Sequence, residues 1–275
     1  MIKIMVDSAS DCRDSSIFDY FIPITIELDG RSYQDGIDID SNTFYNLLTT
    51  TAQFPKTSQP SPDAFRKIFA EAKNNGDEIL YFSLSSALSG TFQSASIAKA
   101  MAEYDGIYII DTKAVTHMIG YFARYARTLI AQGLSAAQIA AECESLKGKI
   151  KVFAGLDTLE YLYKGGRLSR AAATVGEVAG IKPILTITEE GTVNAGSKAI
   201  GMNRAMQTIL AKVSCFEIDG RFPMYSLYTH GTENVEKLET KLTAAGYATR
   251  QRLQIGSTIG AHTGPGVYGV LFVAK

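Results

Sequence analysis

Short apolar runs alternate with segments of helical spacing along the first half of the chain. Four runs rich in β-branched and apolar residues have the length of buried strands: residues 2–6, 22–28, 79–82 and 107–110. Between them, Ser61 and Pro62 predict the start of a helix that ends at Gly76. Ser135 predicts the start of another helix. Such alternation predicts a doubly wound, mostly parallel sheet with helices on both faces.

The pattern restarts after residue 148. Further strands are predicted at residues 152–156, 184–187, 224–228 and 267–273, with a glycine-rich helical stretch between the first two. Two amphipathic helices are predicted, one over residues 203–213 and one that places Val235, Leu238 and Leu242 on a single face. The sequence therefore predicts two α/β domains, residues 1–148 and 149–275. We expect a doubly wound, mostly parallel sheet in the first and a smaller mixed sheet with helices in the second.

Charge and hydropathy exclude several classes of partner. The 275 residues include 27 Lys and Arg and 28 Asp and Glu, a formal net charge of −1 without a basic block, so we expect no nucleic-acid partner. No apolar run approaches the roughly 20 residues that span a bilayer, and the first residues enter a strand pattern at once. We therefore expect no stable membrane insertion and a cytoplasmic location.

The most informative stretch is residues 82–94, where a strand-like run leads directly into hydroxyl side chains and a glycine. The hydroxyls of Ser85, Ser86, Ser89 and Thr91 surround Gly90. A strand end followed by a helix start supplies unpaired backbone N–H groups, the positive end of a helix dipole and O–H donors. This combination suits a bound carboxylate or phosphate, and an ordinary loop with a helix cap is the alternative.

Three more segments carry candidate binding residues. Thr57 and Ser58 lie just ahead of the helix that Ser61 caps, where their hydroxyls either face a ligand or satisfy only their own turn. His262 lies in a loop with three glycines, which allow close backbone approach, and its imidazole is able to donate to an anion. Arg167 follows two glycines and is able to hold a phosphate, unless this segment only separates two helices.

Enzymatic chemistry has weaker support. The chain has no Walker A sequence, no Gly-x-Gly-x-x-Gly after a predicted strand, no His-Glu-x-x-His and no Cys-x-x-Cys, so we expect no cofactor. Asp7 and Asp11 follow the first strand, but further Mg²⁺ ligands are not evident, so we expect no metal. Ser89, Asp111 and His262 follow the chain order of an α/β-hydrolase without its Gly-x-Ser-x-Gly elbow. A serine hydrolase acting on acyl esters is therefore the enzymatic alternative, and a protein-interaction role for the loops is a third.

Seven short motifs follow one another along the chain. They are Asp7-Ser-Ala-Ser-Asp11, Lys56-Thr-Ser-Gln-Pro-Ser61, Leu84-Ser-Ser-Ala-Leu-Ser-Gly-Thr91, Asp111-Thr112, Gly165-Gly-Arg-Leu-Ser169, Ile181-Lys-Pro-Ile184 and Ala261-His-Thr-Gly264. In this order and with these intervals, the chain resembles the DegV family of bacterial fatty-acid-binding proteins. The resemblance covers residues 2–275 and implies two α/β domains with a long acyl chain buried between or within them.

The resemblance also implies which residues hold the ligand. In that family the threonine of Thr-Ser-Gln, the serine before Gly-Thr and the histidine of Ala-His-Thr-Gly bind the fatty-acid carboxylate. These residues match Thr57, Ser89 and His262. The full set of expected fatty-acid-binding residues is Thr57, Ser58, Ser89, Gly90, Arg167 and His262. The implied function is a non-enzymatic carrier of one long-chain fatty acid.

A partner protein is implied as well. Some members of the family present the carboxylate to the catalytic subunit of a fatty acid kinase, which phosphorylates it to an acyl phosphate. Members that dock this kinase tend to carry an arginine shortly after the turn at Gly191. Here Lys198 is present, but Ala199 or Ile200 occupies the position of the arginine. The resemblance thus implies fatty-acid binding more directly than it implies kinase docking.

Overall fold

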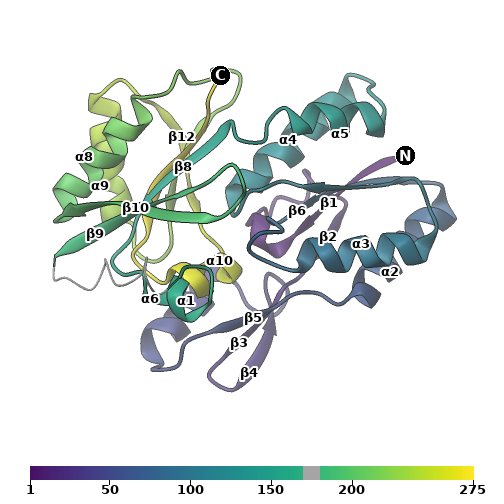
Figure 1. Cartoon of the computed structure of the whole chain (residues 1–275), viewed down its shortest axis with the longest axis horizontal. Coiled ribbons are helices and arrows are strands. Elements are labelled where there is room, and N and C mark those ends of the chain that lie inside the picture. Colours follow the sequence, from purple (N-terminus) through teal and green to yellow (C-terminus); the bar gives the residue numbers. More distant parts are fainter. Residues whose placement is uncertain (170–179) are drawn as a thin grey trace.

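The computed structural model describes residues 1–169 and 180–275 (Figure 1). The first half of the chain contains a four-stranded parallel sheet in the order β2-β1-β6-β7. Its strands are β1 (Ile2–Asp7), β2 (Tyr20–Ile22), β6 (Glu78–Ser83) and β7 (Ile107–Asp111). Because parallel strands end at the same edge of a sheet, the loops after β1, β6 and β7 meet at one edge.

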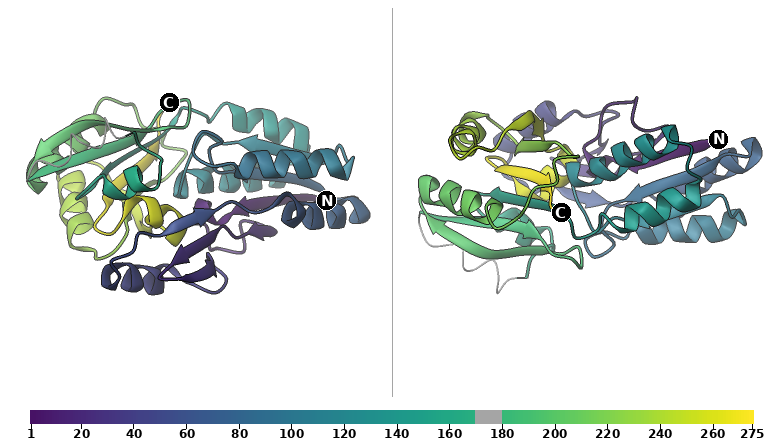
Figure 2. Two further views of the ribbon diagram at one scale, coloured as in Figure 1. Left: turned by 60° about the horizontal axis from the view of Figure 1, so that its bottom comes forward. Right: turned by 90° about the horizontal axis from the view of Figure 1, so that it is seen from above.

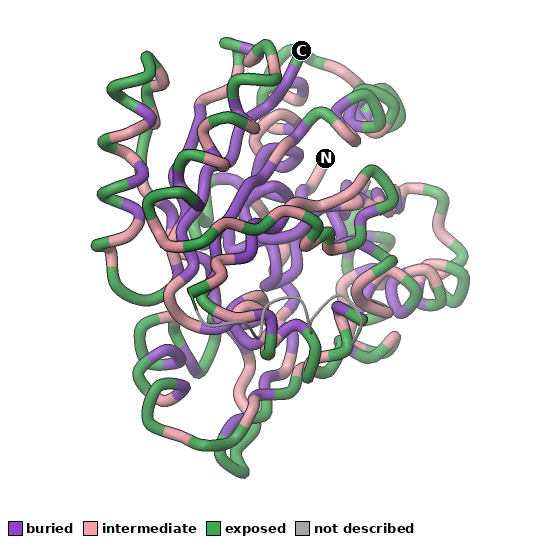
Figure 3. Tube along the Cα trace, turned by 60° about the vertical axis from the view of Figure 1, so that its left-hand side comes forward, coloured by how far each residue is buried: buried purple, intermediate pink, exposed green. Residues whose placement is uncertain are grey.

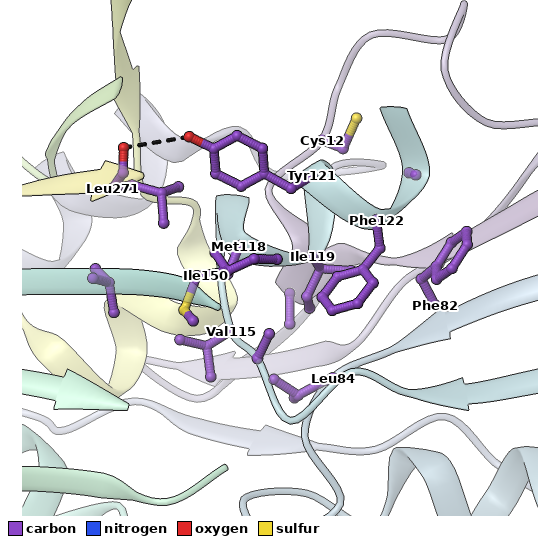
Figure 4. Packing of buried hydrophobic residues seen from close by; sticks show 14 of the residues in the cluster. Cys12, Phe82, Leu84, Val115, Met118, Ile119, Tyr121, Phe122, Ile150 and Leu271 are labelled. Carbon is purple, nitrogen blue, oxygen red and sulfur yellow. Dashed lines mark hydrogen bonds between the residues drawn. The ribbon is translucent and has the colours of Figure 1, made fainter. Parts of the chain in front are cut away.

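Helices cover both faces of this sheet. Consecutive residues of a strand point to opposite faces, so a strand that is apolar throughout needs helices on both sides to bury it. They are α2 (Pro62–Asn75), α3 (Thr91–Ala102), α4 (His117–Ala131) and α5 (Ala136–Glu144). Met5 and Tyr81 are buried with α2 and α3, whereas Val6 and Phe82 are buried with α4 and α5. Figure 4 shows Phe82 beside Phe122 of α4, with ring centroids 6.0 Å apart. The doubly wound arrangement expected from the sequence is confirmed.

The second half contains a mixed sheet in the order β10-β9-β8-β13-β11-β12. Its strands are β8 (Ile150–Gly155), β9 (Ile181–Ile187), β10 (Val193–Ile200), β11 (Met224–Tyr228), β12 (Thr249–Gln254) and β13 (Tyr268–Val273). One face packs against α8 (Met202–Val213) and α9 (Glu233–Ala244). The other face joins the core of the first half, where Tyr121 of α4 donates a 3.3 Å hydrogen bond to the Leu271 carbonyl (Figure 4).

The mixed sheet has six strands, so the expectation that it is the smaller sheet was wrong. The two strands absent from the prediction, β10 and β12, lie at the edges of the sheet. Edge strands face water and carry polar residues, here Asn-Ala-Gly-Ser-Lys and Thr-Arg-Gln-Arg, which lack an apolar strand pattern. Figure 2 shows the parallel sheet and its helices beside the mixed sheet. The division of domains at residue 148 stays a prediction.

A third, antiparallel sheet was not predicted. It contains β3 (Thr25–Leu28), β4 (Arg31–Gln34) and β5 (Lys56–Ser58) in the order β4-β3-β5, and it packs with α1 (Ser41–Thr50). We call it the small sheet. The single strand expected over residues 22–28 was wrong, because the chain passes at Pro23 from β2 of the parallel sheet into β3 of the small sheet. Proline has no N–H for a strand ladder, which suits a change of sheet.

Two short helices complete the described chain near the centre of the molecule. They are α6 (Glu160–Lys164) and α10 (Ser257–Thr263), and they contact each other. The helical stretch expected before strand β9 includes residues 170–179, which lie outside the described residues. Among the described helices, none combines the length and apolar character needed to cross a bilayer. Figure 3 shows that the buried segments gather in the middle of the molecule.

Candidate functional site

A cavity of about 400 Å³ lies between the two halves of the molecule. This volume falls within the roughly 300–1,000 Å³ typical of small-molecule sites. Most of its wall is aliphatic and buried, with Val152, Ala154, Leu185 and Leu227 from the inner face of the mixed sheet. Leu84 lines the cavity from the loop after β6, where Figure 4 shows it close to Val115. The two halves therefore enclose one apolar space.

Polar side chains gather at the partly exposed part of the cavity wall, which we call the mouth. The mouth comprises Thr57, Ser58, Ser89, Gly90, Arg167 and His262, the six residues expected from the sequence; all except Gly90 line the cavity, and Gly90 adjoins Ser89. Thr57 lies on β5, and its Oγ1 is 2.8 Å from Nε2 of His262. His262 reaches this place because the neighbouring Ala261 is buried in the core of the small sheet.

The imidazole of His262 is neutral at pH 7. Burial and the nearby charge of Arg167 lower its pKa to about 4. Its Nδ1 is buried, has no hydrogen-bond partner among the described residues, and faces Gly165, where an added Cβ would collide with the ring. A neutral imidazole carries one N–H and one acceptor nitrogen, so the ring is able to pair with Thr57 without bringing a charge.

Arg167 supplies positive charge to the mouth. Its Nε donates to the Leu88 carbonyl at 3.0 Å, and its Nη1 donates to the Gly165 carbonyl at 2.6 Å. Within residues 1–169 and 180–275 no carboxylate lies at ion-pair distance from this guanidinium. Partial burial lowers the pKa of Arg167. The guanidinium still carries its charge at pH 7, because its ordinary pKa lies far above neutral pH. A charge held only by carbonyls favours a bound anion.

Ser89 and Gly90 bring the start of α3 to the mouth. The hydroxyls of Ser89 and Thr91 are 2.8 Å apart, and α3 begins without a side-chain cap. An added Cβ at Gly90 would collide with the side-chain amide of Gln59, which in turn donates to the Ser94 hydroxyl at 2.9 Å. Glycine at this position therefore leaves room for the flexible Gln59 side chain between the loop that follows Thr57 and the first turn of α3.

The hydrolase trio is not assembled in this structure. Asp111 accepts from the Ser86 hydroxyl at 2.5 Å and pairs with Lys113 at 2.7 Å. In the part of the chain that the structure describes, Nδ1 of His262, the nitrogen that a triad carboxylate would orient, has no hydrogen-bond partner. Ser89 and His262 both line the cavity, whereas Asp111 is not part of its wall.

Asp7 at the end of β1 and Asp11 just after it form buried hydrogen bonds with neighbouring segments of the fold. Asp7 accepts from the Tyr81 hydroxyl at 2.8 Å and the Leu84 amide at 2.9 Å, and burial raises its pKa to about 6. Asp11 accepts from the Thr116 hydroxyl at 2.5 Å, and burial raises its pKa to about 7. The described residues contain no group of three potential His, Cys, Asp or Glu ligands for a metal ion.

Sequence reasoning missed the aliphatic wall and Gln59. The wall residues of β8 and β9 have the same apolar pattern as core residues, so no local signal separates a cavity wall from a packed core. Gln59 could have been identified from the sequence, because it belongs to the Thr-Ser-Gln motif and directly follows the hydroxyls of Thr57 and Ser58.

Comparisons with known proteins extend over the whole chain. Residues 1–275 match the model of a family described as "Uncharacterised protein, DegV family". A DegV domain-containing protein of Caldanaerobacter subterraneus subsp. tengcongensis is 34% identical over 279 residues, which cover 100% of this chain and 99% of that protein. A solved structure described as "Fatty Acid Binding of a DegV family Protein from Thermus thermophilus" is 32% identical and has a TM-score of 0.88. That match covers 100% of this chain and 99% of the other.

The fold is also shared with the Fatty Acid Kinase (Fak) B3 protein of Streptococcus pneumoniae, solved loaded with linoleic acid. It is 23% identical with a TM-score of 0.87, and the match covers 100% of both chains. The shared fold, the relative above 30% identity and the family model that spans residues 1–275 agree, and the chain belongs to the DegV family.

Proposed function

We propose that the protein binds one long-chain fatty acid, with the carboxylate at the mouth and the acyl tail in the cavity. The observation that carries this proposal is a cavity with an aliphatic, buried wall and a polar mouth, where the Arg167 guanidinium has no carboxylate partner among residues 1–169 and 180–275. Such a space matches a molecule with one anionic end and a long apolar remainder. The related Thermus thermophilus protein, whose structure is described as fatty-acid-binding, supports the same ligand class.

The tail supplies most of the affinity. Each buried methylene contributes about 0.8 kcal/mol, so about fourteen methylenes contribute on the order of 10 kcal/mol before ordering costs. A hydrogen bond to a charged group adds only about 1.5–3 kcal/mol. Retention therefore depends on the aliphatic wall, and the mouth determines where the carboxylate lies.

The mouth offers the carboxylate several donors. If Nε2 of His262 carries the ring proton and donates to Thr57, the Thr57 hydroxyl keeps its own proton for the carboxylate. Ser89 is able to donate in the same way, with Thr91 as the second member of its pair. Arg167 adds long-range attraction, because no carboxylate of the described part of the chain lies at ion-pair distance from its guanidinium. Ser58 and Gly90 complete the surface around these donors.

We further propose that the protein is a carrier that presents the carboxylate to a fatty acid kinase. The half-buried mouth supports this role, because a head group held there stays within reach of a second protein. Lys198 and Ile200 are exposed on the edge strand β10, and Ile200 is 66% exposed. A serine hydrolase is not proposed, because Asp111 is engaged by Ser86 and Lys113.

Native mass spectrometry of the purified protein tests the proposal. We expect one bound molecule per chain, and extraction into organic solvent should release a fatty acid of roughly sixteen to eighteen carbons, the acyl size assumed in the burial estimate. A protein that is empty and also refuses added palmitate would contradict the proposal. Labelling of Ser89 by a fluorophosphonate probe would instead support a hydrolase.

A further inference from the structure

Helix α10 carries His262 near its C-terminal end, and its N-terminal end is held by a residue more than 200 positions earlier in the chain. Asp35, which follows β4, is fully buried. Its Oδ2 accepts the amide N–H of Thr258 at 3.1 Å and the hydroxyl of Thr258 at 2.6 Å. The residue at the N-cap of α10 is Gly256, which has no side chain to cap the helix. Asp35 therefore caps α10 from another part of the chain.

Asp35 is itself held in place. Its Oδ1 pairs with Nη2 of Arg13 at 3.1 Å, and its backbone N–H donates to the Ile24 carbonyl at 3.1 Å. A buried carboxylate is tolerated when a partner charge and hydrogen bonds satisfy it, and here both oxygens are used. The side chain thus has one defined position from which to hold the helix.

The small sheet and the residue that follows its strand β4 contact α10 near both ends of the helix. Asp35 follows β4 and holds the first turn, while Thr57 on β5 contacts His262 in the last turn. Thr258 and His262 are four residues apart, so they lie on the same face of the helix one turn apart. Both also line the cavity. A shift of the first turn therefore displaces the imidazole relative to the Thr57 hydroxyl.

We infer that Asp35 is a positioning residue for the mouth: by capping α10 it holds the imidazole of His262 at the hydroxyl of Thr57. Asp35 itself lies outside the cavity wall, so it acts on the mouth only through α10. The ligand in this inference rests on the proposed function, but the position of His262 can be measured without a ligand.

The experiment compares Asp35→Ala and Asp35→Asn with Asp219→Ala. Asp219 is a matched control, because it is buried and paired with an arginine, Arg221, but does not line the cavity. Nitrogen NMR of ¹⁵N-labelled, ligand-free protein reports the ring of His262, assigned with the His262→Gln variant. Titration with palmitate labelled with ¹³C at the carboxyl carbon then gives the affinity and a head-group signal.

We expect Asp35→Ala to raise the pKa of His262 from about 4 toward its usual value and to weaken palmitate binding roughly tenfold. Asp35→Asn should retain part of both properties, because its amide oxygen still accepts from the Thr258 N–H while its NH2 group no longer accepts from Arg13. Asp219→Ala should change neither. An unchanged His262 signal in Asp35→Ala, or an equal change in Asp219→Ala, would overturn the positioning role.

A second variant covers the case in which Asp35→Ala does not fold. Thr258→Val removes one of the two hydrogen bonds to Asp35 and keeps the amide bond, so we expect a smaller shift of the His262 signal in the same direction. No shift in a folded Thr258→Val protein would overturn the inference. If the wild type binds no palmitate but the His262 signal still responds to Asp35→Ala, the proposed function fails and the positioning role stands.

Discussion

The mouth and the interior of the cavity differ in chemistry, burial and origin. The mouth is half-buried and takes Thr57, Ser89, Arg167 and His262 from four separate segments. The interior is buried and takes aliphatic side chains from the mixed sheet, such as Val152 and Leu185, and from loops of both halves, such as Leu84 and Leu156. Hydrocarbon burial accumulates with every methylene, whereas the mouth makes a small number of directed contacts. We therefore propose that the interior retains the ligand and that the mouth orients it.

Filling the interior should have the largest effect. Ala154 on β8 is buried and lines the cavity, so Ala154→Phe takes space that the acyl tail requires. If about four methylenes lose their burial, about 3 kcal/mol is lost, which corresponds to roughly a 100-fold higher Kd for palmitate. Isothermal titration calorimetry measures this change.

The control for this prediction is Ala211→Phe, which adds the same ring to an exposed position on α8. We expect its Kd to match the wild type. Circular dichroism of Ala154→Phe checks that the variant is folded. A folded Ala154→Phe protein with unchanged affinity would show that the tail does not use this cavity.

Removing the charge at the mouth should have the second largest effect. Arg167→Gln deletes the guanidinium at the mouth, and loss of a charged contact of about 1.5–3 kcal/mol weakens binding roughly tenfold or more. The same change should raise the pKa of His262, because the positive charge of Arg167 contributes to lowering it. Burial contributes more, so the pKa of His262 should stay below its usual value.

Calorimetry and an NMR titration of His262 measure these two effects. Arg66→Gln is the matched control, because Arg66 lies on the exposed surface and pairs with Asp63. We expect it to change neither quantity. Wild-type affinity in Arg167→Gln would mean that hydroxyl donors alone hold the carboxylate.

Removing one hydroxyl at the mouth should have a smaller effect. Ser89→Ala deletes one neutral donor to the carboxylate, at the lower end of the about 1.5–3 kcal/mol of a hydrogen bond to a charged group, so the Kd should rise roughly tenfold. If a kinase uses the ligand, transfer should fall more than binding, because the carboxylate is misplaced. Ser96→Ala, on α3 outside the cavity wall, is the control. Equal losses of binding and transfer would argue against an orienting role.

The sequence predicted the parallel sheet better than the small sheet. Ile79, Tyr81 and Phe82 lie in a strand that is buried on both faces, and such strands have continuous apolar patterns that are visible without a structure. The small sheet consists of three- and four-residue strands, and β4 and β5 contain mostly polar residues. Strands this short show no reliable alternation, so their pairing depends on tertiary contacts.

The mouth was predicted through motifs and the interior was not. Hydroxyls, glycines and a histidine are unusual in clusters, so Thr57, Ser89 and His262 attract notice in the sequence alone. Val152 and Leu227 are ordinary strand residues, and only the arrangement of the two sheets leaves space beside them. Asp35 had no signal either, because its partner Thr258 is 223 residues away.

The effect of pH should be the smallest of all and tests whether the mouth works with neutral donors. With its pKa lowered to about 4, His262 stays uncharged in the empty protein between pH 8 and pH 6. A bound carboxylate favours the protonated ring, so binding takes up protons and the affinity rises slightly as pH falls. We expect less than about a fivefold gain between pH 8 and pH 6 by calorimetry, and none in His262→Gln. A loss of affinity toward pH 6 would contradict this sign, because it would require a group at the mouth that must lose a proton to bind the ligand.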